Sequence, residues 1–324
     1  MKLKDIYKKA VAVGINSDPR GRDAVSKVLQ RAEKEYSGLK PDEKDLFDLE
    51  SLENPYADTR ILNGSGEEEI NSILVGIDCE AGEVLLVESL RNRGEAVDLI
   101  MSHHPEGMAY ANLYSVMHMQ ADILNRFGVP INIAEDLMET RINEVQRKIM
   151  PFNHARAVDA AKLLGFPFIC IHTPADNMVA AFLQKLLDDT KPDTLSDLTG
   201  LLREIPEYRS AAKNGSGPRI ILGSKTRKAG KVFVDMTGGT EGSKDIFGSL
   251  TSAGVNTIVA MHLGEESRKE AEKNHLNVVI AGHISSDNLG LNLLFDEIFP
   301  DEAGSPVKIL ECSGFNRIMR SSKV

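Results

Sequence analysis

The sequence predicts an α/β fold, and three observations support this prediction. From residue 73 onward, apolar stretches typical of strands alternate with stretches typical of helices, a pattern that favours parallel strands joined by helices. Two clusters of turn-forming residues, 188–193 and 213–218, interrupt the pattern before it resumes. Several strands also end in histidine or glycine directly before a helix. We therefore expect two α/β subdomains that join around residues 195–219.

The expected elements fall into three parts. Residues 1–70 form a helical N-terminal extension, in which residues 1 to about 53 are amphipathic and carry no chemical motif. The first subdomain spans residues 71–195, with strands predicted over 73–78, 97–101 and 168–171 and helices over 83–92, 109–127, 135–150, 154–164 and 178–187. The second subdomain spans residues 196–324, with strands predicted over 231–235, 257–261, 277–281 and 307–311 and helices between them.

Composition narrows the class of protein. The chain has 324 residues, with 38 Lys and Arg against 48 Asp and Glu, a net charge of −10. This acidic balance argues against nucleic acid as the main partner. A group of basic residues around Lys225 to Lys231 is best interpreted as a solvated turn. The alternative interpretation is a rim of positive charge that attracts phosphate.

The three cysteines of the chain lie far apart without CxxC spacing, which argues against a zinc-thiolate site and a disulfide framework. Because neither a signal peptide nor a membrane span is apparent, we expect a cytoplasmic protein without membrane contact.

Two adjacent histidines are the most informative local feature. His103 and His104 follow an apolar strand and precede Pro105, which places both imidazoles at the carboxyl edge of the predicted sheet, where α/β folds bind ligands. Successive side chains of a strand point to opposite faces, so the two rings suit two metal ions better than one. Taken alone, such a pair is more often a solvated loop or a hydrogen-bonded core histidine.

Two further clusters have the same design. His172 follows the strand predicted over 168–171 and precedes Asp176, and His283 follows the strand over 277–281 and precedes Asp287. Each aspartate alone is explained as a residue of the first helical turn, where the helix dipole favours negative charge. Three clusters at strand ends make a ligand role the better explanation.

Together these clusters predict a metal centre. His103, His104, Asp176, His283 and Asp287 supply three imidazoles and two carboxylates, a set that suits zinc, manganese, iron, cobalt or nickel rather than calcium. Five ligands suffice for two ions about 3.5–4 Å apart. We expect Asp176 to bridge them. His172 is expected beside the metals or as a general acid/base.

The motifs resemble those of the NGG-interacting-factor-three-like family, also called the GTP cyclohydrolase 1 type 2 family. The resemblance covers residues 70–311 and rests on Ser-His-His-Pro at 102–105, His-Thr-x-x-Asp at 172–176 and Gly-His-x-x-Ser-Asp at 282–287. It implies a dinuclear metal centre in the cleft between two α/β subdomains, held by the five residues named above. It also implies a homo-oligomer such as a hexameric ring.

Four departures from the family's pattern bear on the substrate. Asp287 stands where the family has the longer glutamate, and Glu106 stands where an apolar residue is usual. The segment between His104 and His172 is longer than usual, and no histidine follows Gly264 and Glu265. Because these differences lie in or near the expected site, they concern substrate choice more than fold.

A glycine-rich loop follows the strand predicted over 231–235. It contains Gly238, Gly239, Gly242 and Lys244 and resembles a P-loop, but it has Gly-Ser-Lys in place of Gly-Lys-Ser or Gly-Lys-Thr. The simpler interpretation is a tight turn between strand and helix. The alternative is that its backbone amides and Lys244 hold a phosphate of the substrate.

These observations predict a metal-dependent hydrolase with a dinuclear centre and a small phosphorylated or nucleotide-like substrate. Metal-bound water is the expected nucleophile, and His172 or Glu106 is expected to transfer protons. A protein of another class also fits: a metal-binding scaffold that regulates, stores or delivers ions without turnover. A plain α/β domain whose histidines have no ligand would require three coincidences.

Overall fold

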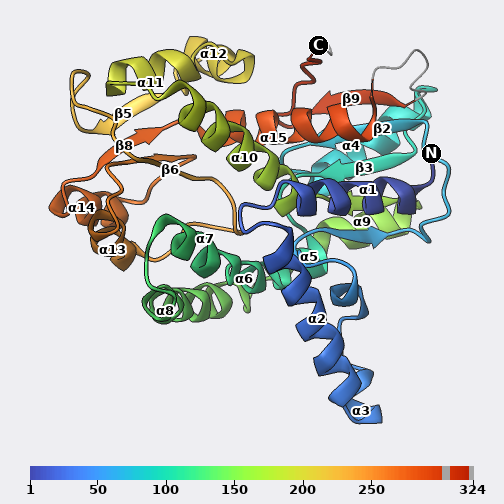
Figure 1. Cartoon of the computed structure of the whole chain (residues 1–324). Helices are drawn as coiled ribbons and strands as arrows, with labels where there is room; N and C mark the ends of the chain where they lie inside the picture. The colour runs from blue at the N-terminus through green and yellow to red at the C-terminus, as the bar shows by residue number, and fades with distance from the viewer. Residues whose placement is uncertain (301–306, 321–324) are drawn as a thin grey trace.

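Two β-sheets form the framework of the molecule, seen in a computed structural model that describes residues 1–300 and 307–320. Figure 1 shows the two sheets at opposite ends of the molecule, linked by long helices. The first sheet has the order β1-β4-β3-β2-β9 and the second the order β5-β8-β7-β6. The strands are β1 Arg60–Asn63, β2 Ser72–Gly76, β3 Leu99–Ser102, β4 Phe168–Cys170, β5 Arg219–Leu222, β6 Val232–Asp235, β7 Thr257–Ala260, β8 Asn277–Ile280 and β9 Lys308–Cys312.

The central strands β2, β3 and β4 of the first sheet are buried at every position, as expected for mostly apolar strands that are covered on both faces. Strands β2, β3, β4 and β9 are parallel, and β1 is an antiparallel edge. Ile73 and Val75 pack with α1 (Leu3–Asn16) and α15 (His283–Ile298). Leu74 lies on the other face and packs with α4 (Ala81–Asn92) and α9 (Arg156–Leu164).

The second sheet follows the same plan, with parallel β6, β7 and β8 and an antiparallel β5. Val232, Val234 and Val259 pack with α10 (Thr173–Thr190) and α11 (Leu195–Leu202), near α12 (Pro206–Lys213). The other face packs with α7 (Met119–Phe127), α8 (Ile131–Ile149) and α13 (Phe247–Ser252). The short η2 (Lys244–Ile246) and α14 (Glu265–Lys273) complete this side.

Helices α10 and α15 pack closely together and link the two sheets. Gly290 on α15 allows this close approach, because a Cβ there would lie 2.4 Å from the backbone oxygen of Ala175 on α10. Both helices begin directly after a strand, α10 after β4 and α15 after β8. Their first turns therefore meet at the carboxyl ends of strands from both sheets.

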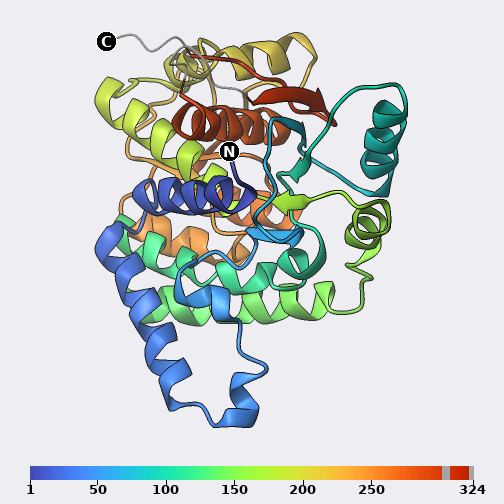
Figure 2. The ribbon, with the colours of Figure 1, turned by 90° about the vertical axis from the view of Figure 1, so that its right-hand side faces the viewer.

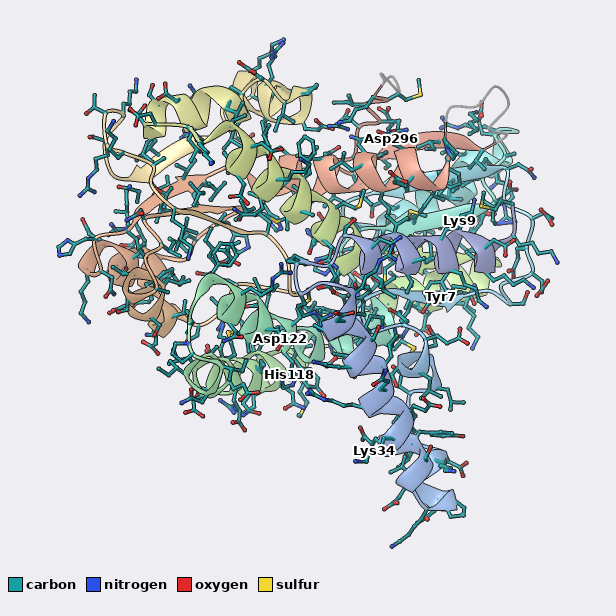
Figure 3. All side chains as sticks on the ribbon, viewed as in Figure 1. Tyr7, Lys9, Lys34, His118, Asp122 and Asp296 are labelled. Atoms are coloured by element: carbon teal, nitrogen blue, oxygen red, sulfur yellow. The ribbon has the colours of Figure 1, made fainter. Side chains whose placement is uncertain are left out.

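The N-terminal residues form α1 and a projecting arm. The arm consists of α2 (Arg22–Gly38), α3 (Pro41–Lys44) and the short η1 (Leu49–Leu52), and Figures 1 and 2 show it extending away from the sheets. Figure 3 shows the exposed Lys34 on the projecting part of α2, where side chains extend from the helix in several directions. Val25 is buried where α2 leaves the body, whereas Leu46 and Leu49 are exposed.

The α/β prediction with two sheets is confirmed, and several elements differ in detail. The helix predicted over 109–127 is three helices, α5 (Gly107–Ala111), α6 (Leu113–Val116) and α7. Strand β1 lies within the extension expected to be helical, because it completes an edge beside β4. Strand β9 pairs with β2 in the first sheet, so the chain returns to that sheet after building the second. None of the helices described combines the length and the apolar character that crossing a bilayer requires.

Candidate metal centre

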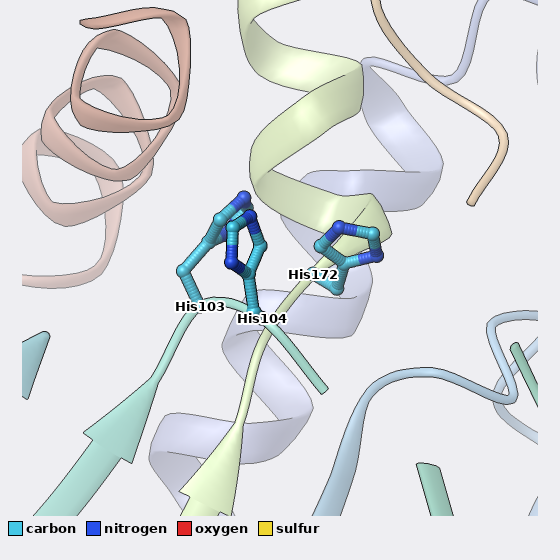
Figure 4. Close-up of side chains that lie close together, drawn as sticks. All are labelled: His103, His104 and His172. Carbon is cyan, nitrogen blue, oxygen red and sulfur yellow. The ribbon is translucent and has the colours of Figure 1, made fainter. Parts of the chain in front are cut away.

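Three imidazoles gather beyond the carboxyl ends of β3 and β4. His103 and His104 directly follow β3, and His172 follows β4. Their ring centroids lie 5.3 Å apart for His103 and His104, and 4.9 Å apart for His103 and His172. Figure 4 shows the three rings close together beside the first turn of α10. The parallel pairing of β3 with β4 places the three residues at one sheet edge.

Two aspartates approach these rings from the first turns of α10 and α15. Asp176 lies on α10, and Asp287 lies on α15, one turn after His283. Both carboxylates are almost completely buried. Because α10 and α15 pack together, residues more than 100 positions apart in the sequence meet at one point.

Three groups of ligand atoms among the described residues could each hold a metal ion: one consists of His103, His104 and His172, and the other two share Asp287. In the inner group, His103 Nε2 lies 3.4 Å from Asp176 Oδ1 and 3.6 Å from Asp287 Oδ1. In the outer group, His104 Nε2 and His283 Nε2 lie 3.5 Å and 3.6 Å from Asp287 Oδ2. Within each group, the ligand atoms lie within 4.8 Å of one another, a spacing that could hold a metal ion. We expected Asp176 to bridge the two groups. In the structure Asp287 has the bridging position, with Oδ1 toward the inner group and Oδ2 toward the outer group.

The second ring nitrogen of three histidines is held by an acceptor. Nδ1 of His103 lies 3.0 Å from the backbone oxygen of Ile171. Nδ1 of His104 lies 2.7 Å from Asp78 Oδ1, and Nδ1 of His172 lies 2.8 Å from Asp58 Oδ2. A carbonyl or carboxylate oxygen only accepts, so Nδ1 donates in each case. In the neutral ring, Nε2 then keeps its lone pair and faces the centre, as in metal-binding histidines.

The centre holds buried polar atoms that fit a cation. His103 Nε2, Asp176 Oδ1 and both carboxylate oxygens of Asp287 are buried and have no hydrogen-bond partner among the described residues. Buried polar atoms nearly always have partners, because leaving them unpaired costs free energy. Four such atoms converging from three residues, all of them metal-ligand types, fit a bound metal ion.

The electrostatics of the metal-free centre also favour positive charge. Burial lowers the pKa of His103, but Asp176 and Asp287 outweigh this effect and raise it to about 10. Burial likewise opposes protonation of His104, whose pKa is raised to about 9 by Asp287 and Asp78. Burial would raise the pKa of Asp287, yet the neighbouring imidazoles, His103 first, lower it far below its ordinary value. Cations are therefore stabilised where the two carboxylates lie.

A cavity of about 480 Å³, called the metal cavity below, opens beside the outer group and is lined by residues that follow strands of both sheets. His104, His172 and His283 line it together with Asp78, Glu80 and Glu106. Glu106 lies at the start of α5, where burial, followed by the charge of Glu80, raises its pKa to about 7. Both residues predicted to transfer protons, His172 and Glu106, thus face the same cavity.

The glycine-rich loop is divided between two cavities. Gly239 lines the metal cavity, whereas Gly242 lines a neighbouring cavity on the other side of the loop. The side-chain amide of Gln120 fixes the loop by donating to the backbone oxygens of Gly238 and Thr240, at 2.6 Å and 2.7 Å. Lys244 starts η2 and approaches Glu266 at 3.9 Å, and it is not among the residues that line the metal cavity. The loop therefore brings one of the four predicted phosphate-binding residues to the centre.

Sequence reasoning missed three residues around the centre. Asp58 is completely buried and accepts from both His172 and Thr173. Asp78 holds His104, and His262 lies with its ring centroid 4.9 Å from that of His283. Asp78 and His262 each lie two residues after a strand, β2 and β7 respectively, so the rule that found the other ligands could have found them. Asp58 precedes a strand that was not predicted.

Comparison with solved structures shows the fold. A NIF3 superfamily protein from Sphaerobacter thermophilus has a TM-score of 0.68 and 24% sequence identity, over 80% of this chain and 92% of that protein. Reduced HcgD from Methanocaldococcus jannaschii has a TM-score of 0.46 and 13% sequence identity, over 78% of this chain and 87% of that protein. A Bacillus cereus protein related to NIF3 has a TM-score of 0.40 and 11% sequence identity, over 78% of this chain and 89% of that protein. No protein-family model and no curated protein matches the chain. The resemblance predicted from the motifs is thus confirmed at the level of the fold.

Proposed function

We propose that the chain is a metal-dependent hydrolase of the NGG-interacting-factor-three-like family, with a dinuclear centre and a small phosphorylated or nucleotide-like substrate. The observation that carries this proposal is the set of buried, unpartnered ligand atoms on His103, Asp176 and Asp287. The inner group, with His103, and the outer group, with His104 and His283, share the Asp287 carboxylate. This arrangement supports two divalent transition metal ions rather than one. The metal-ligand motifs and the fold agree with this assignment.

Each group would hold one ion. The inner site would use His103 Nε2 with Asp176 and Asp287, and the outer site would use His104, His283 and Asp287. Zinc, manganese, iron, cobalt and nickel all suit these nitrogen and oxygen ligands. When bound, two such ions polarise a phosphoryl or carbonyl oxygen and acidify a coordinated water.

The chain's own residues would position protons and exclude water. Asp58 fixes the ring of His172, so that Nε2 faces Asp176 Oδ2 at 3.6 Å and can accept or donate a proton at the edge of the cavity. Glu106 faces the cavity from another wall and is the second candidate for proton transfer. The nearly complete burial of Asp176 and Asp287 strengthens electrostatic interactions at the reacting group.

Elemental analysis and an activity screen test this proposal together. Protein purified without added metal is compared with His103→Ala and Asp176→Ala, and each is screened on nucleotides and phosphoesters. We expect two transition metal ions per chain in the wild type, fewer in both variants, and turnover that follows metal content. Glu106→Gln should keep its metal and lose most of its turnover. A wild-type protein that binds no transition metal after reconstitution would contradict the proposal.

The half-exposed outer group favours a second candidate function, a scaffold that stores or delivers metal. The side chains of His104 and His283 are 26% and 41% exposed, so an ion held there could exchange with solvent. Two tightly bound ions with no turnover on any substrate class would favour this alternative. The homo-oligomer, such as a hexameric ring, remains a prediction that mass measurement in solution tests.

A further inference from the structure

Helix α8 contributes a separate wall to the metal cavity. It lies in the segment between His104 and His172, which is longer than the family resemblance leads one to expect. Ile142, Val145 and Ile149 anchor α8 in the hydrophobic core beneath the second sheet. Figure 1 shows α8 beside α7 and apart from the first sheet. A rigid element therefore borders the cavity without supplying any of the proposed metal ligands.

The face that α8 turns to the cavity has a defined pattern. Arg141, Val145, Lys148 and Ile149 all line the cavity, and their spacing places them on one side of a helix. Phe152 follows just beyond the helix and also lines the cavity. The face thus combines two cations with an apolar surface between and beside them.

These two cations are available to a ligand. Arg141 Nε donates to the backbone oxygen of Glu241 at 3.1 Å, which fixes the guanidinium at the cavity wall. One terminal nitrogen of Arg141 pairs with Glu144 at 2.9 Å, and the other has no hydrogen-bond partner among the described residues. Lys148 has neither an ion pair nor a hydrogen bond within residues 1–300 and 307–320. Arg141 and Lys148 are also the only Lys or Arg side chains in the described cavity lining.

The acidic residues that line the cavity lie on elements other than α8. Asp78, Glu80 and Glu106 come from the ends of β2 and β3 and carry acidic groups. Asp235, the last residue of β6, and Glu241, in the loop that follows, add two more. The Glu241 carboxylate accepts from the backbone nitrogen of Gly264, at the start of α14. An anionic group of a ligand is repelled from these parts of the wall and is attracted to α8. The charge distribution therefore gives a ligand a preferred orientation.

We infer that α8 binds a second, non-reacting anionic group of the substrate through Arg141 and Lys148. The substrate is then a bifunctional molecule, with a hydrolysable group at the metal ligands and a carboxylate or phosphate at α8. Phe152, which is 54% exposed, accepts the apolar part that connects the two ends, together with the small parts of Val145 and Ile149 that reach the cavity. This inference rests on the proposed function and names its substrate class.

Binding of alkylphosphonates to the metal-loaded full chain tests the inference without requiring turnover. Each phosphonate carries a terminal carboxylate, a terminal phosphonate or a neutral carboxamide, in a series of increasing chain length, and affinity is measured by calorimetry. At the chain length that spans the cavity, we expect the anionic ends to bind at least about tenfold more tightly than the carboxamide. A carboxylate that outperforms the second phosphonate, or the reverse, identifies the kind of anion preferred.

Two variants and a matched control complete the experiment. Lys148→Gln and Arg141→Gln should each remove most of the advantage of the anionic end and leave the metal content and the carboxamide affinity unchanged. Arg147→Gln removes an exposed cation from the adjacent position of α8, which does not line the cavity, and should retain the full advantage. Lys148 is exposed, so its variant should fold as the wild type does.

The outcomes separate the two proposals. If no phosphonate binds although the metals are present, the proposed function fails, and the inference fails with it. If phosphonates bind but an anionic end gives no advantage at any length, the inference alone is overturned. An advantage that persists in both Lys148→Gln and Arg141→Gln would also overturn it.

Discussion

The inner and outer groups of the centre share Asp287 but differ in their surroundings. The side chains of His103 and Asp176 are 1% and 7% exposed, whereas those of His104 and His283 are 26% and 41% exposed. The inner group lies where α10 and α15 begin beside the first sheet, and of its ligands His103 is away from the cavity while Asp176 and the shared Asp287 line it. Both histidines of the outer group line the cavity. Asp287 thus connects a group that is shielded from water to a group that is partly open to it.

The difference has a physical consequence for metal binding. Without metal, the buried carboxylates of the inner group rely on the neighbouring imidazoles for counter-charge. A metal ion bound there would supply that charge away from water, so we expect it to leave slowly. The outer group is partly solvated, and water can replace an ion there at lower cost. We therefore expect the inner ion to be structural and slowly exchanging, and the outer ion to be labile and in contact with substrate.

Replacing the shared carboxylate gives the largest expected effect. Asp287→Ala removes one ligand from both groups, so both ions should bind more than about 100-fold more weakly, beyond the loss typical of residues that only support a ligand. Elemental analysis after dialysis should find almost no metal. Circular dichroism checks that the variant is folded. A variant that retains one ion at full occupancy would show that Asp287 serves only one group.

Replacing a ligand of one group should remove one ion. Asp176→Ala should lose the inner ion, and His283→Ala should lose the outer ion while the other site remains filled. A chelator added to the wild type should remove one ion quickly and the second slowly, and His283→Ala should show only the slow phase. Equal release rates for both ions in the wild type would refute the distinction between a shielded and an open site.

The residues that orient the imidazoles provide a finer test. A backbone oxygen orients His103, whereas the Asp78 side chain orients His104. Asp78→Asn should therefore weaken the outer ion by about 10- to 100-fold and leave the inner ion unchanged. Titration with a metal-sensitive dye measures both affinities, and Glu80→Gln is the matched control in the same cavity wall. A weakening of both sites alike would contradict the assignment.

Much of the fold and most of the site follow from local sequence patterns. Continuous apolar runs identify the central strands because both faces of each sheet are buried. Polar residues directly after those runs identify His103, His172 and His283, because parallel strands expose their carboxyl ends at one edge. These features depend on residues close together in the chain.

Other features depend on contacts that no local pattern encodes. Strand β9 pairs with β2 across more than 200 residues, and its sequence alone does not select that partner. Asp287 lies between the two groups because of how closely α10 and α15 pack at Gly290. Lys244 belongs to a suggestive motif, but the path of the loop is set by Gln120 from a distant helix. Tertiary packing therefore decides which predicted residues meet.

The smallest expected effect concerns how far water reaches into the open side of the centre. Asp235, the last residue of β6, lines the cavity, and burial, together with the charge of Glu241, raises its pKa to about 6. Because the folded protein favours the neutral carboxyl, its ionisation destabilises the fold as pH rises from about 4 through about 6, and the loss persists above that range.

In the metal-free protein, Asp235→Asn should therefore increase the free energy of unfolding at pH 7 by roughly 3 kcal/mol and have little effect at pH 4. Denaturant unfolding of wild type and variant across this range measures the difference, with Asp245→Asn as a control outside the metal cavity. A variant equally stable to the wild type at both pH values would mean that water already solvates Asp235. The open side of the centre would then extend deeper than the outer group, and the contrast with the shielded inner group would be larger still.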